Sequence, residues 1–325
     1  MEERNRPTSL HNSELRGVNN RKLFMLVDGS AIIHRAYHAM PSFTKTDGTP
    51  TGAVFGFFSM TLKLMQNIHP DYITIAFDRP KPTFRQEMYV GYHANRPKAS
   101  DELKTQFQLV RDILHEVSIP VYEVDGFEAD DVIGTINAKI NKQFKDILVY
   151  VVTGDRDMLQ LVDDDTHVVM PVKGISEVMI YNKARVIEKY GVRPDQIIDL
   201  KAFMGDPSDN YPGVAGVGPK TAMQLLQKYE HFETVFEKIS EIEKDNPRLA
   251  KKLADGVDQA YMAQKLAAIH LEVPFVFEME KCDATRFTRR KFEQAFAKFE
   301  FNSLIKRLDD VFGKNGNNKN QMKLL

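Results

Sequence analysis

The residues with the clearest chemical potential are nine carboxylates that lie where predicted strands end or predicted helices begin. Any one of them is ordinarily a helix cap or an exposed loop side chain, because aspartate is favoured at both positions. Gathered at one edge of a sheet, they would repel one another and raise one another's pKa values unless a cation compensates them. The nine are Asp28, Asp78, Glu128, Asp130, Asp131, Asp155, Asp157, Asp206 and Asp209.

Such a group of carboxylates indicates divalent metal ions. Oxygen ligands without histidine or cysteine favour Mg²⁺ or Mn²⁺ over zinc. A magnesium ion usually keeps several waters and takes only one or two carboxylates, so a group of this size indicates two or more ions. Paired ions about 3.5–4 Å apart are typical of phosphodiester hydrolysis. The carboxylates therefore predict metal-dependent phosphoryl chemistry.

Three short apolar runs, residues 23–27, 72–77 and 147–152, must position these carboxylates. The runs are rich in β-branched and aromatic residues, which is typical of strands buried on both faces of a parallel sheet. An α/β domain is the fold that such strands form with intervening helices, and its ligands bind outside the carboxyl ends of the strands. Amphipathic segments between the runs predict helices over residues 52–68, 101–117 and 129–140.

Beyond about residue 193 the pattern becomes helical. Residues 273–277 are either a strand or a buried connector. Helices are predicted over residues 195–204, 220–229, 232–239, 259–271 and 287–308. We therefore divide the chain into a disordered polar tail (1–20), an α/β core (21–192), a helical region (193–312) and a second disordered polar tail (313–325).

Composition excludes several classes of protein. The 44 basic and 45 acidic residues give a net charge of −1, so any basic surface for nucleic acid must be local. The single cysteine, Cys282, excludes a disulfide framework and a cysteine-rich zinc site, and it fits a reducing cytoplasm. No apolar run reaches the roughly 18 residues of a membrane span, and residues 1–20 are too polar for a signal peptide. We expect a cytoplasmic monomer with no membrane partner.

A basic segment interleaved with aromatic residues follows Asp78. Cations neutralise phosphates and aromatic rings stack on bases, so such a segment suits a path for nucleic acid. Its spacings of four, three and four residues would place residues 85, 89, 92 and 96 on one face of a helix. A solvated amphipathic helix is the competing interpretation, and the neighbouring carboxylates favour the functional one. The candidates are Arg79, Lys81, Arg85, Tyr92, His93 and Arg96.

A glycine-rich turn over residues 211–222 is the sharpest local signal. Its glycines allow a tight turn with exposed backbone, and Pro219 is suited to the first position of a helix. Amides at such a helix start can bind phosphate without sequence preference. A simple connector is the alternative interpretation. The candidate contacts are Gly213, Gly216, Gly218, Lys220 and Thr221.

Five motifs together resemble the 5′-nuclease domain of bacterial DNA polymerase I and the related flap endonucleases. In chain order they read LFMLVDGSAIIHRAYHA, AFDRPKPTFRQE, GFEADDVIGT, VTGDRDMLQLV and GDPSDNYPGVAGVGPKTA. The resemblance implies the PIN-like 5′-nuclease fold, a twisted, mostly parallel sheet flanked by helices, with a helix–hairpin–helix-type DNA-binding region. It also implies Mg²⁺-dependent hydrolysis of DNA at 5′ ends and flaps, in primer removal and repair at the bacterial nucleoid.

The resemblance also implies roles for the candidate residues. The glycine turn would grip the backbone of downstream duplex and offer a K⁺ site on its carbonyls. Arg85 and Arg96 would neutralise the phosphate, and Tyr92 would stack on a displaced base in a helical gateway for the 5′ strand. A first metal would lie among Asp28, Asp78, Glu128, Asp130 and Asp131, and a second would be held or supported by Asp155, Asp157, Asp206 and Asp209.

Two features depart from the family pattern. His93 stands where the family usually has lysine, and histidine with a free pKa near 6.5 is mostly neutral at neutral pH. We therefore expect lower activity than in a lysine-bearing relative, rising as the pH falls toward about 6. In addition, 325 residues leave no room for proofreading and polymerase domains, so we expect a stand-alone nuclease or a detached domain.

Two other functions fit parts of the sequence. A DNA-junction binding module without catalysis would explain His93, although the complete acidic set argues against it. A PIN-like nuclease that cuts RNA would explain the carboxylates but not the glycine-rich turn.

Overall fold

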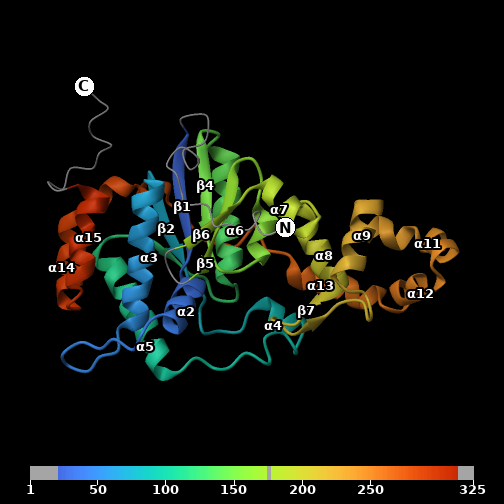
Figure 1. Cartoon of the computed structure of the whole chain (residues 1–325), viewed down its shortest axis with the longest axis horizontal. Coiled ribbons are helices and arrows are strands. Elements are labelled where there is room, and N and C mark those ends of the chain that lie inside the picture. The colour runs from blue at the N-terminus through green and yellow to red at the C-terminus, as the bar shows by residue number, and fades with distance from the viewer. Residues whose placement is uncertain (1–20, 174–176, 314–325) are drawn as a thin grey trace.

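Six strands form one sheet in the order β3-β2-β1-β4-β5-β6 (Figure 1). The computed structural model describes residues 21–173 and 177–313, so the tails predicted at 1–20 and 313–325 lie, apart from Gly313, outside the described residues. Strands β1 to β5 run parallel and β6 pairs antiparallel with β5, which confirms the predicted mostly parallel sheet. The strands are β1 (Lys22–Asp28), β2 (Tyr72–Ala76), β3 (Val121–Tyr122), β4 (Ile147–Val152), β5 (Thr166–Lys173) and β6 (Glu177–Tyr181).

The three predicted apolar runs are β1, β2 and β4, whereas the sequence pattern does not predict β5 and β6. These two strands form the antiparallel edge of the sheet. His167 and Pro171 interrupt the apolar character of β5, and proline is tolerated in a sheet mainly at edges and bulges. The pairing of β5 with β6 shifts its register between Pro171 and Lys173.

The central strand β1 divides the hydrophobic core in two, because successive strand residues point to opposite faces. Leu23, Met25 and Val27 pack into one buried cluster, and Phe24 and Leu26 pack into the other. Helices therefore cover both faces of the sheet, as predicted for an α/β domain (Figure 1). On the face of Leu23, Met25 and Val27 the covering helices include α2 (Gly29–Ala39), α3 (Gly52–Ile68) and α5 (Asp101–Glu116). On the opposite face they include α6 (Ala129–Gln143).

The last two described helices return to the sheet. Residues 287–308 were expected to form one helix and instead form α14 (Arg289–Lys298) and α15 (Asn302–Phe312), separated by a turn in which Glu300 is left-handed (φ 59°). Both contribute to the core cluster that contains α3, and Figure 1 shows them beside that helix.

The remaining helices form a lobe at the other end of the molecule (Figure 1). Residues 273–277 are a connector without strand structure. A two-stranded hairpin, β7 (Gly205–Asp206) and β8 (Tyr211–Pro212), lies at the base of the lobe. The helices are α8 (Ile197–Met204), α9 (Pro219–Tyr229), α10 (Phe232–Glu237), α11 (Ile239–Asp245), α12 (Pro247–Asp255) and α13 (Val257–Ala267), after the short α7 (Lys183–Tyr190).

The basic segment after Asp78 is not the single helix that its spacing predicts. Helix α4 covers only Phe84–Met88, and residues 90–95 are turns. The backbone of His93 is left-handed (φ 57°), and its N–H donates to the Asp209 carbonyl at 2.9 Å. Tertiary contact with the β7–β8 hairpin thus replaces helical hydrogen bonding, so the predicted helical face does not exist.

Candidate active site

The carboxyl ends of β1, β2 and β4 bring their carboxylates to one edge of the sheet. Asp28 is the last residue of β1 and pairs with Ala76 of β2. Asp78 follows Ala76 by two residues and therefore lies at the same edge. Asp155 and Asp157 follow β4, which is the other neighbour of β1. Parallel pairing therefore gathers side chains that are more than a hundred residues apart in the chain.

Seven of the nine predicted carboxylates line one cavity of about 390 Å³. Asp131 and Asp206 are not among its lining residues. His93, Arg96, Arg85, Arg79 and Lys81 also line the cavity, so the basic segment lies beside the acids as expected. The seven are Asp28, Asp78, Glu128, Asp130, Asp155, Asp157 and Asp209.

Asp28, Asp78, Asp130 and Asp155 are called the first cluster, because they line the cavity together and their charges raise the pKa values of Asp28 and Asp130. Asp155, which was expected beside the second metal, thus joins the acids expected around the first. Each of three accepts a backbone N–H: Asp28 from Ala31, Asp78 from Ala129 and Asp155 from Asp157, all at 2.8–2.9 Å. Asp28 also accepts from the Thr153 hydroxyl at 2.7 Å.

Like charge and burial shift the pKa values of this first cluster. Burial, with the charges of Asp78 and Asp155, raises the pKa of Asp28 to about 7. Desolvation and the same neighbours raise the pKa of Asp130 well above its ordinary value. Carboxylate oxygens are hard donors that suit divalent cations. A divalent cation in this cavity would offset the repulsion among the carboxylates that raises their pKa values.

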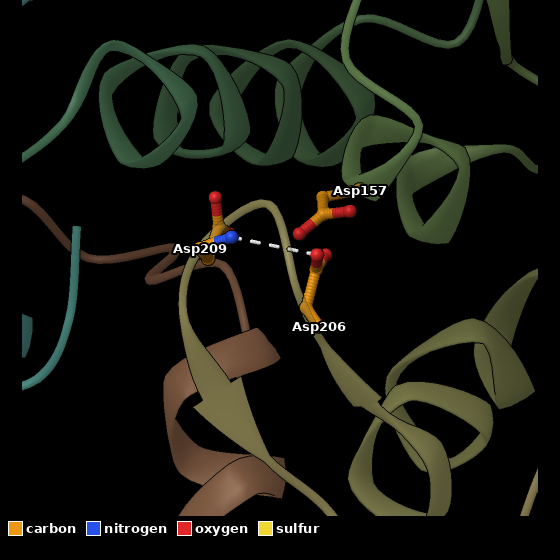
Figure 2. Close-up of side chains that lie close together, drawn as sticks. All are labelled: Asp157, Asp206 and Asp209. Atoms are coloured by element: carbon orange, nitrogen blue, oxygen red, sulfur yellow. Dashed lines mark hydrogen bonds between the residues drawn. The ribbon is translucent and has the colours of Figure 1, made fainter. Parts of the chain in front are cut away.

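The second cluster consists of Asp157, Asp206 and Asp209, with one oxygen from each lying within 4.8 Å of the others (Figure 2). All three are buried. Figure 2 shows Asp206 and Asp209 on the β7–β8 hairpin and Asp157 on the segment after β4. Burial and the charge of Asp155 raise the pKa of Asp157 to about 7. The helical lobe thus supplies two of these three acids and the sheet supplies the third.

Lys201 is a cation of the second cluster that the sequence analysis missed. Its ammonium, on α8, forms ion pairs with Asp157 and Asp206. Burial opposes the effect, but the Lys201 charge and the Ser208 hydroxyl lower the pKa of Asp206. The available signal was a lysine within a mostly apolar helix, five residues before Asp206.

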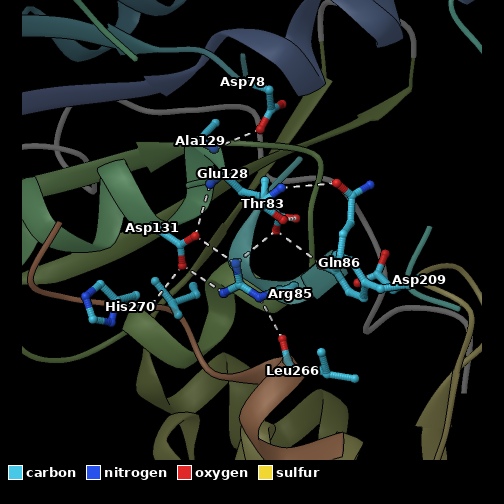
Figure 3. A network of polar contacts seen from close by, with 12 residues as sticks. Asp78, Thr83, Arg85, Gln86, Glu128, Ala129, Asp131, Asp209, Leu266 and His270 are labelled. Atoms are coloured by element: carbon cyan, nitrogen blue, oxygen red, sulfur yellow. Dashed lines mark hydrogen bonds and ion pairs between the residues drawn. The ribbon is translucent and has the colours of Figure 1, made fainter. Parts of the chain in front are cut away.

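Arg85 is buried and does not reach toward the solvent (Figure 3). It forms a bidentate ion pair with Asp131, both bonds at 2.7 Å, and contacts Glu128 at 3.1 Å. Its remaining donors reach the carbonyl oxygens of Leu266 at 2.9 Å and Ala268 at 2.7 Å. All five N–H donors of the guanidinium are therefore occupied.

This network corrects two predicted roles. Arg85 has no donor left for a phosphate, so it positions Glu128 and joins α4 to α6 and to the end of α13. Asp131 is 0% exposed and accepts from Arg85 and from the His270 N–H at 2.8 Å. It therefore points away from the cavity and is not placed as a metal ligand.

Of the other residues of the basic segment, Tyr92 and His93 stack on each other inside the protein, whereas Arg96 is exposed. Tyr92 is buried, donates to Glu128 at 3.2 Å and stacks on the ring of His93 at 3.9 Å. Its predicted stacking on a displaced base is thus not available in this conformation. His93 Nε2 lies 3.2 Å from Asp209, and Arg96 contacts the same oxygen at 2.7 Å while its side chain stays 52% exposed. Arg96 is the predicted phosphate contact that remains accessible.

Arg79 and Lys81 lie at the rim of the cavity but are already paired with acids. Arg79 contacts Glu123 at 3.0 Å and Asp125 at 2.6 Å, and Lys81 contacts Asp125 at 2.6 Å. These side chains are 38% and 60% exposed, so their ion pairs are of the weak surface type.

The glycine-rich turn has one buried and two exposed glycines. Gly213 is buried, and a Cβ added there would lie 2.3 Å from the Gly205 nitrogen. Gly213 therefore allows close backbone packing inside the protein, and its role as a DNA contact stays a prediction. Gly216 and Gly218 are exposed before α9, beside exposed Lys220 and half-buried Thr221.

A cation of α12 extends this turn. The Lys252 ammonium donates to the Gly216 carbonyl at 2.9 Å. Arg248 and Lys251 lie one helical turn or less from Lys252 on the exposed face of α12, opposite buried Ala250 and Leu253. The turn and α12 therefore form one local basic surface in a chain of nearly zero net charge.

Comparison with known proteins identifies the family. Residues 23–191 match the model of the 5′-3′ exonuclease N-terminal resolvase-like domain, and residues 192–290 match that of the 5′-3′ exonuclease C-terminal SAM fold. The chain belongs to the 5′-3′ exonuclease family. A 5′-3′ exonuclease of Aquifex aeolicus is 34% identical over 291 residues, covering 90% of this chain and 96% of that protein.

Other members of the family are larger. DNA polymerase I of Bacillus subtilis is 37% identical over 293 residues, covering 90% of this chain. This 5′-3′ exonuclease family member spans about a third (33%) of the length of that polymerase.

Solved structures share the fold. The T5 5′-exonuclease bound to divalent metal ions (zinc) has a TM-score of 0.59 at 20% identity, covering 89% of this chain and 98% of that one. The catalytic core of Rad2 in complex with a DNA substrate has a TM-score of 0.56 at 16% identity, covering 93% and 95%. No helix within residues 21–173 and 177–313 is long and apolar enough to cross a membrane.

Stability of the metal-free protein is expected to fall as the pH rises. Asp28 and Asp157 have pKa values of about 7 in the folded state, against an ordinary value of 3.8. Between these values the folded state must bind protons that the unfolded chain has released, so stability decreases with pH and levels off above about 7. In EDTA the melting temperature should drop by roughly 10 °C between about pH 5 and pH 7.5, and Mg²⁺ should restore it.

The control for this experiment is Asp28→Asn. Asparagine keeps the oxygen that caps α2 but cannot ionise, so its melting temperature should depend less on pH and on Mg²⁺. A melting temperature of the unsubstituted protein that changes with neither pH nor Mg²⁺ would contradict the pKa assignments.

Proposed function

We propose that this protein is a structure-specific 5′ nuclease that hydrolyses DNA phosphodiesters at 5′ ends and flaps with two magnesium ions. The observation that carries this proposal is the gathering of seven carboxylates on one cavity in a member of the 5′-3′ exonuclease family. The oxygen donor set supports Mg²⁺, with Mn²⁺ as a substitute.

Divalent ions in this cavity would supply a water of lowered pKa and neutralise charge on the reacting phosphate. Arg96 would contact the same phosphate, and its half-exposed side chain at the cavity that holds the acids supports this role. Glu128 is held in place by Arg85 and by the hydroxyls of Thr83 and Tyr92. One ion would be held by Asp28, Asp78, Asp130 and Asp155, and the other by Asp157, Asp206 and Asp209.

The duplex part of the substrate would lie across the glycine-rich turn and α12. Exposed amides at the start of α9 and the cations Lys220, Lys251 and Lys252 suit phosphate oxygens, which are the same in every sequence. Specificity would therefore come from the shape of the DNA. The Rad2 core bound to a DNA substrate supports this choice of partner. A K⁺ ion on the turn would share the Gly216 carbonyl with Lys252 or displace it.

The polymerase I relatives support a role in primer removal and DNA repair. We place this role in the bacterial cytoplasm, at the nucleoid, and assign it to a monomer.

A cleavage panel tests the function. Single-stranded, nicked, gapped and 5′-flap DNA of one sequence, and the matching RNA flap, are incubated with Mg²⁺ or with EDTA. We expect Mg²⁺-dependent cleavage of flap and nicked DNA and little cleavage of RNA. Preferred RNA cleavage would favour the PIN-like RNA nuclease, and tight flap binding without cleavage would favour a junction-binding module.

A further inference from the structure

The two acidic clusters differ in how the folded chain compensates their charge. Among the described residues, no lysine, arginine or histidine forms an ion pair with the four acids of the first cluster. Asp28, Asp78 and Asp155 accept from backbone amides, and Asp28 also accepts from the Thr153 hydroxyl. The first cluster therefore keeps its repulsion until an external cation arrives.

The second cluster already has internal cations. Lys201 pairs with Asp157 and Asp206, and Arg96 and His93 contact Asp209. The Lys201 side chain is only 14% exposed, so its ammonium is held among the acids. Every carboxylate of the second cluster thus has a cationic or imidazole partner from the chain itself.

A divalent ion at the second cluster would bind the same carboxylates, Asp157 and Asp206, that Lys201 contacts. Two cations bound to the same carboxylates would lie within a few ångströms of each other, and in a buried site that repulsion is strong. Lysine has a flexible four-carbon stem, so the ammonium can turn toward another anion without unfolding α8. A phosphate entering the cavity is such an anion.

We propose that Lys201 is a tethered cation that competes with the second metal ion, so that the first cluster is occupied at rest and the second fills only with substrate. This inference rests on the proposed function, because it presumes that both clusters bind divalent ions. It assigns Lys201 as a positioning residue for metal loading. Lys201 remains outside the set of metal ligands.

Calorimetric titration of Mn²⁺ into the full chain without DNA tests the inference. The unsubstituted protein should show one tight binding event and a much weaker second one. Lys201→Met should tighten the second event by about tenfold or more, because a like charge has been removed from a buried site. The first event should not change, because Lys201 contacts no acid of the first cluster.

Two further variants sharpen the test. Lys228→Met removes an exposed lysine of α9 that pairs with Glu241 and Asp245, and it should leave both binding events unchanged. Lys201→Arg keeps the charge and should keep the second event weak. If Lys201→Met does not fold, Lys201→Gln, which is polar and of similar length, is titrated in its place.

The outcomes separate this inference from the proposed function. A second event that stays weak in Lys201→Met, while the first is intact, overturns the competition and leaves the nuclease proposal standing. Absence of any Mn²⁺ binding in the unsubstituted protein overturns the nuclease proposal itself.

Discussion

The double variant Asp155→Asn/Asp157→Asn is expected to lose DNA cleavage by about 10³-fold or more while it still binds flap DNA. Each substitution removes a carboxylate from a different cluster, and even side chains that only support a metal ligand contribute about 10–100-fold. Binding should survive because the glycine-rich turn and α12 lie outside the acidic cavity. Cleavage is measured as single-turnover rates with Mg²⁺, and binding is measured in Ca²⁺ or EDTA.

The folded state of the double variant can be checked separately, so that a loss of cleavage is not mistaken for misfolding. Asparagine keeps the oxygen at position 155 that accepts the N–H of residue 157, so the local turn is preserved. The single variant Asp155→Asn should also raise the melting temperature of the metal-free protein, because the charge of Asp155 repels that of Asp157 and Asp155 has, within the part of the chain that the structure describes, no cationic partner to lose. Asp164→Asn, at an exposed surface pair with Lys183, is the matched control and should change neither property. If the double variant cleaves DNA at the full rate, the acidic cavity is not the catalytic site.

The gathering of the acids could be predicted from sequence because it follows from topology. Parallel strands place their carboxyl ends at one edge, so residues that follow such strands must lie near one another. Asp28 and Asp155 illustrate this, since β1 and β4 pair directly. The same logic needs no knowledge of side-chain contacts.

The orientation of adjacent acids could not be predicted in this way. Asp130 and Asp131 are neighbours in the first turn of α6, and successive helical residues point about 100° apart. Asp130 faces the cavity and Asp131 faces Arg85. Which of the two turns inward depends on the distant contact with α4, which the local sequence does not encode.

The helical spacing of residues 85–96 was misleading for a related reason. Asn210 donates to the Gly91 carbonyl at 2.7 Å, and His93 donates to the Asp209 carbonyl. These bonds, from more than a hundred residues away in the chain, stabilise turns where the side-chain pattern alone favours a helix. Helix propensity is a weak preference that tertiary contacts often override.

Arg85→Leu is expected to destabilise the protein by about 3–5 kcal/mol, because it leaves the carboxylate of Asp131 buried and unpaired. It also removes the bonds that join α4 to α6, to the last turn of α13 and to Ala268. The free energy of unfolding is measured by urea titration at neutral pH. Arg96→Leu is the control: its pair with Asp209 is half exposed, so it should cost at most about 1 kcal/mol while cleavage decreases.

The opposite result would support the role that the sequence analysis predicted for Arg85, a contact to the phosphate. If Arg85→Leu unfolds like the unsubstituted protein but binds DNA weakly, its guanidinium is a phosphate contact and the buried network is not the solution structure. A double variant, Arg85→Met/Asp131→Leu, separates pairing from packing. Removing both charges should cost less than removing Arg85 alone, because no ionised group is then left buried without a partner. Cleavage by that variant should still be reduced, since Glu128 loses the Arg85 contact and keeps only the Thr83 and Tyr92 hydroxyls.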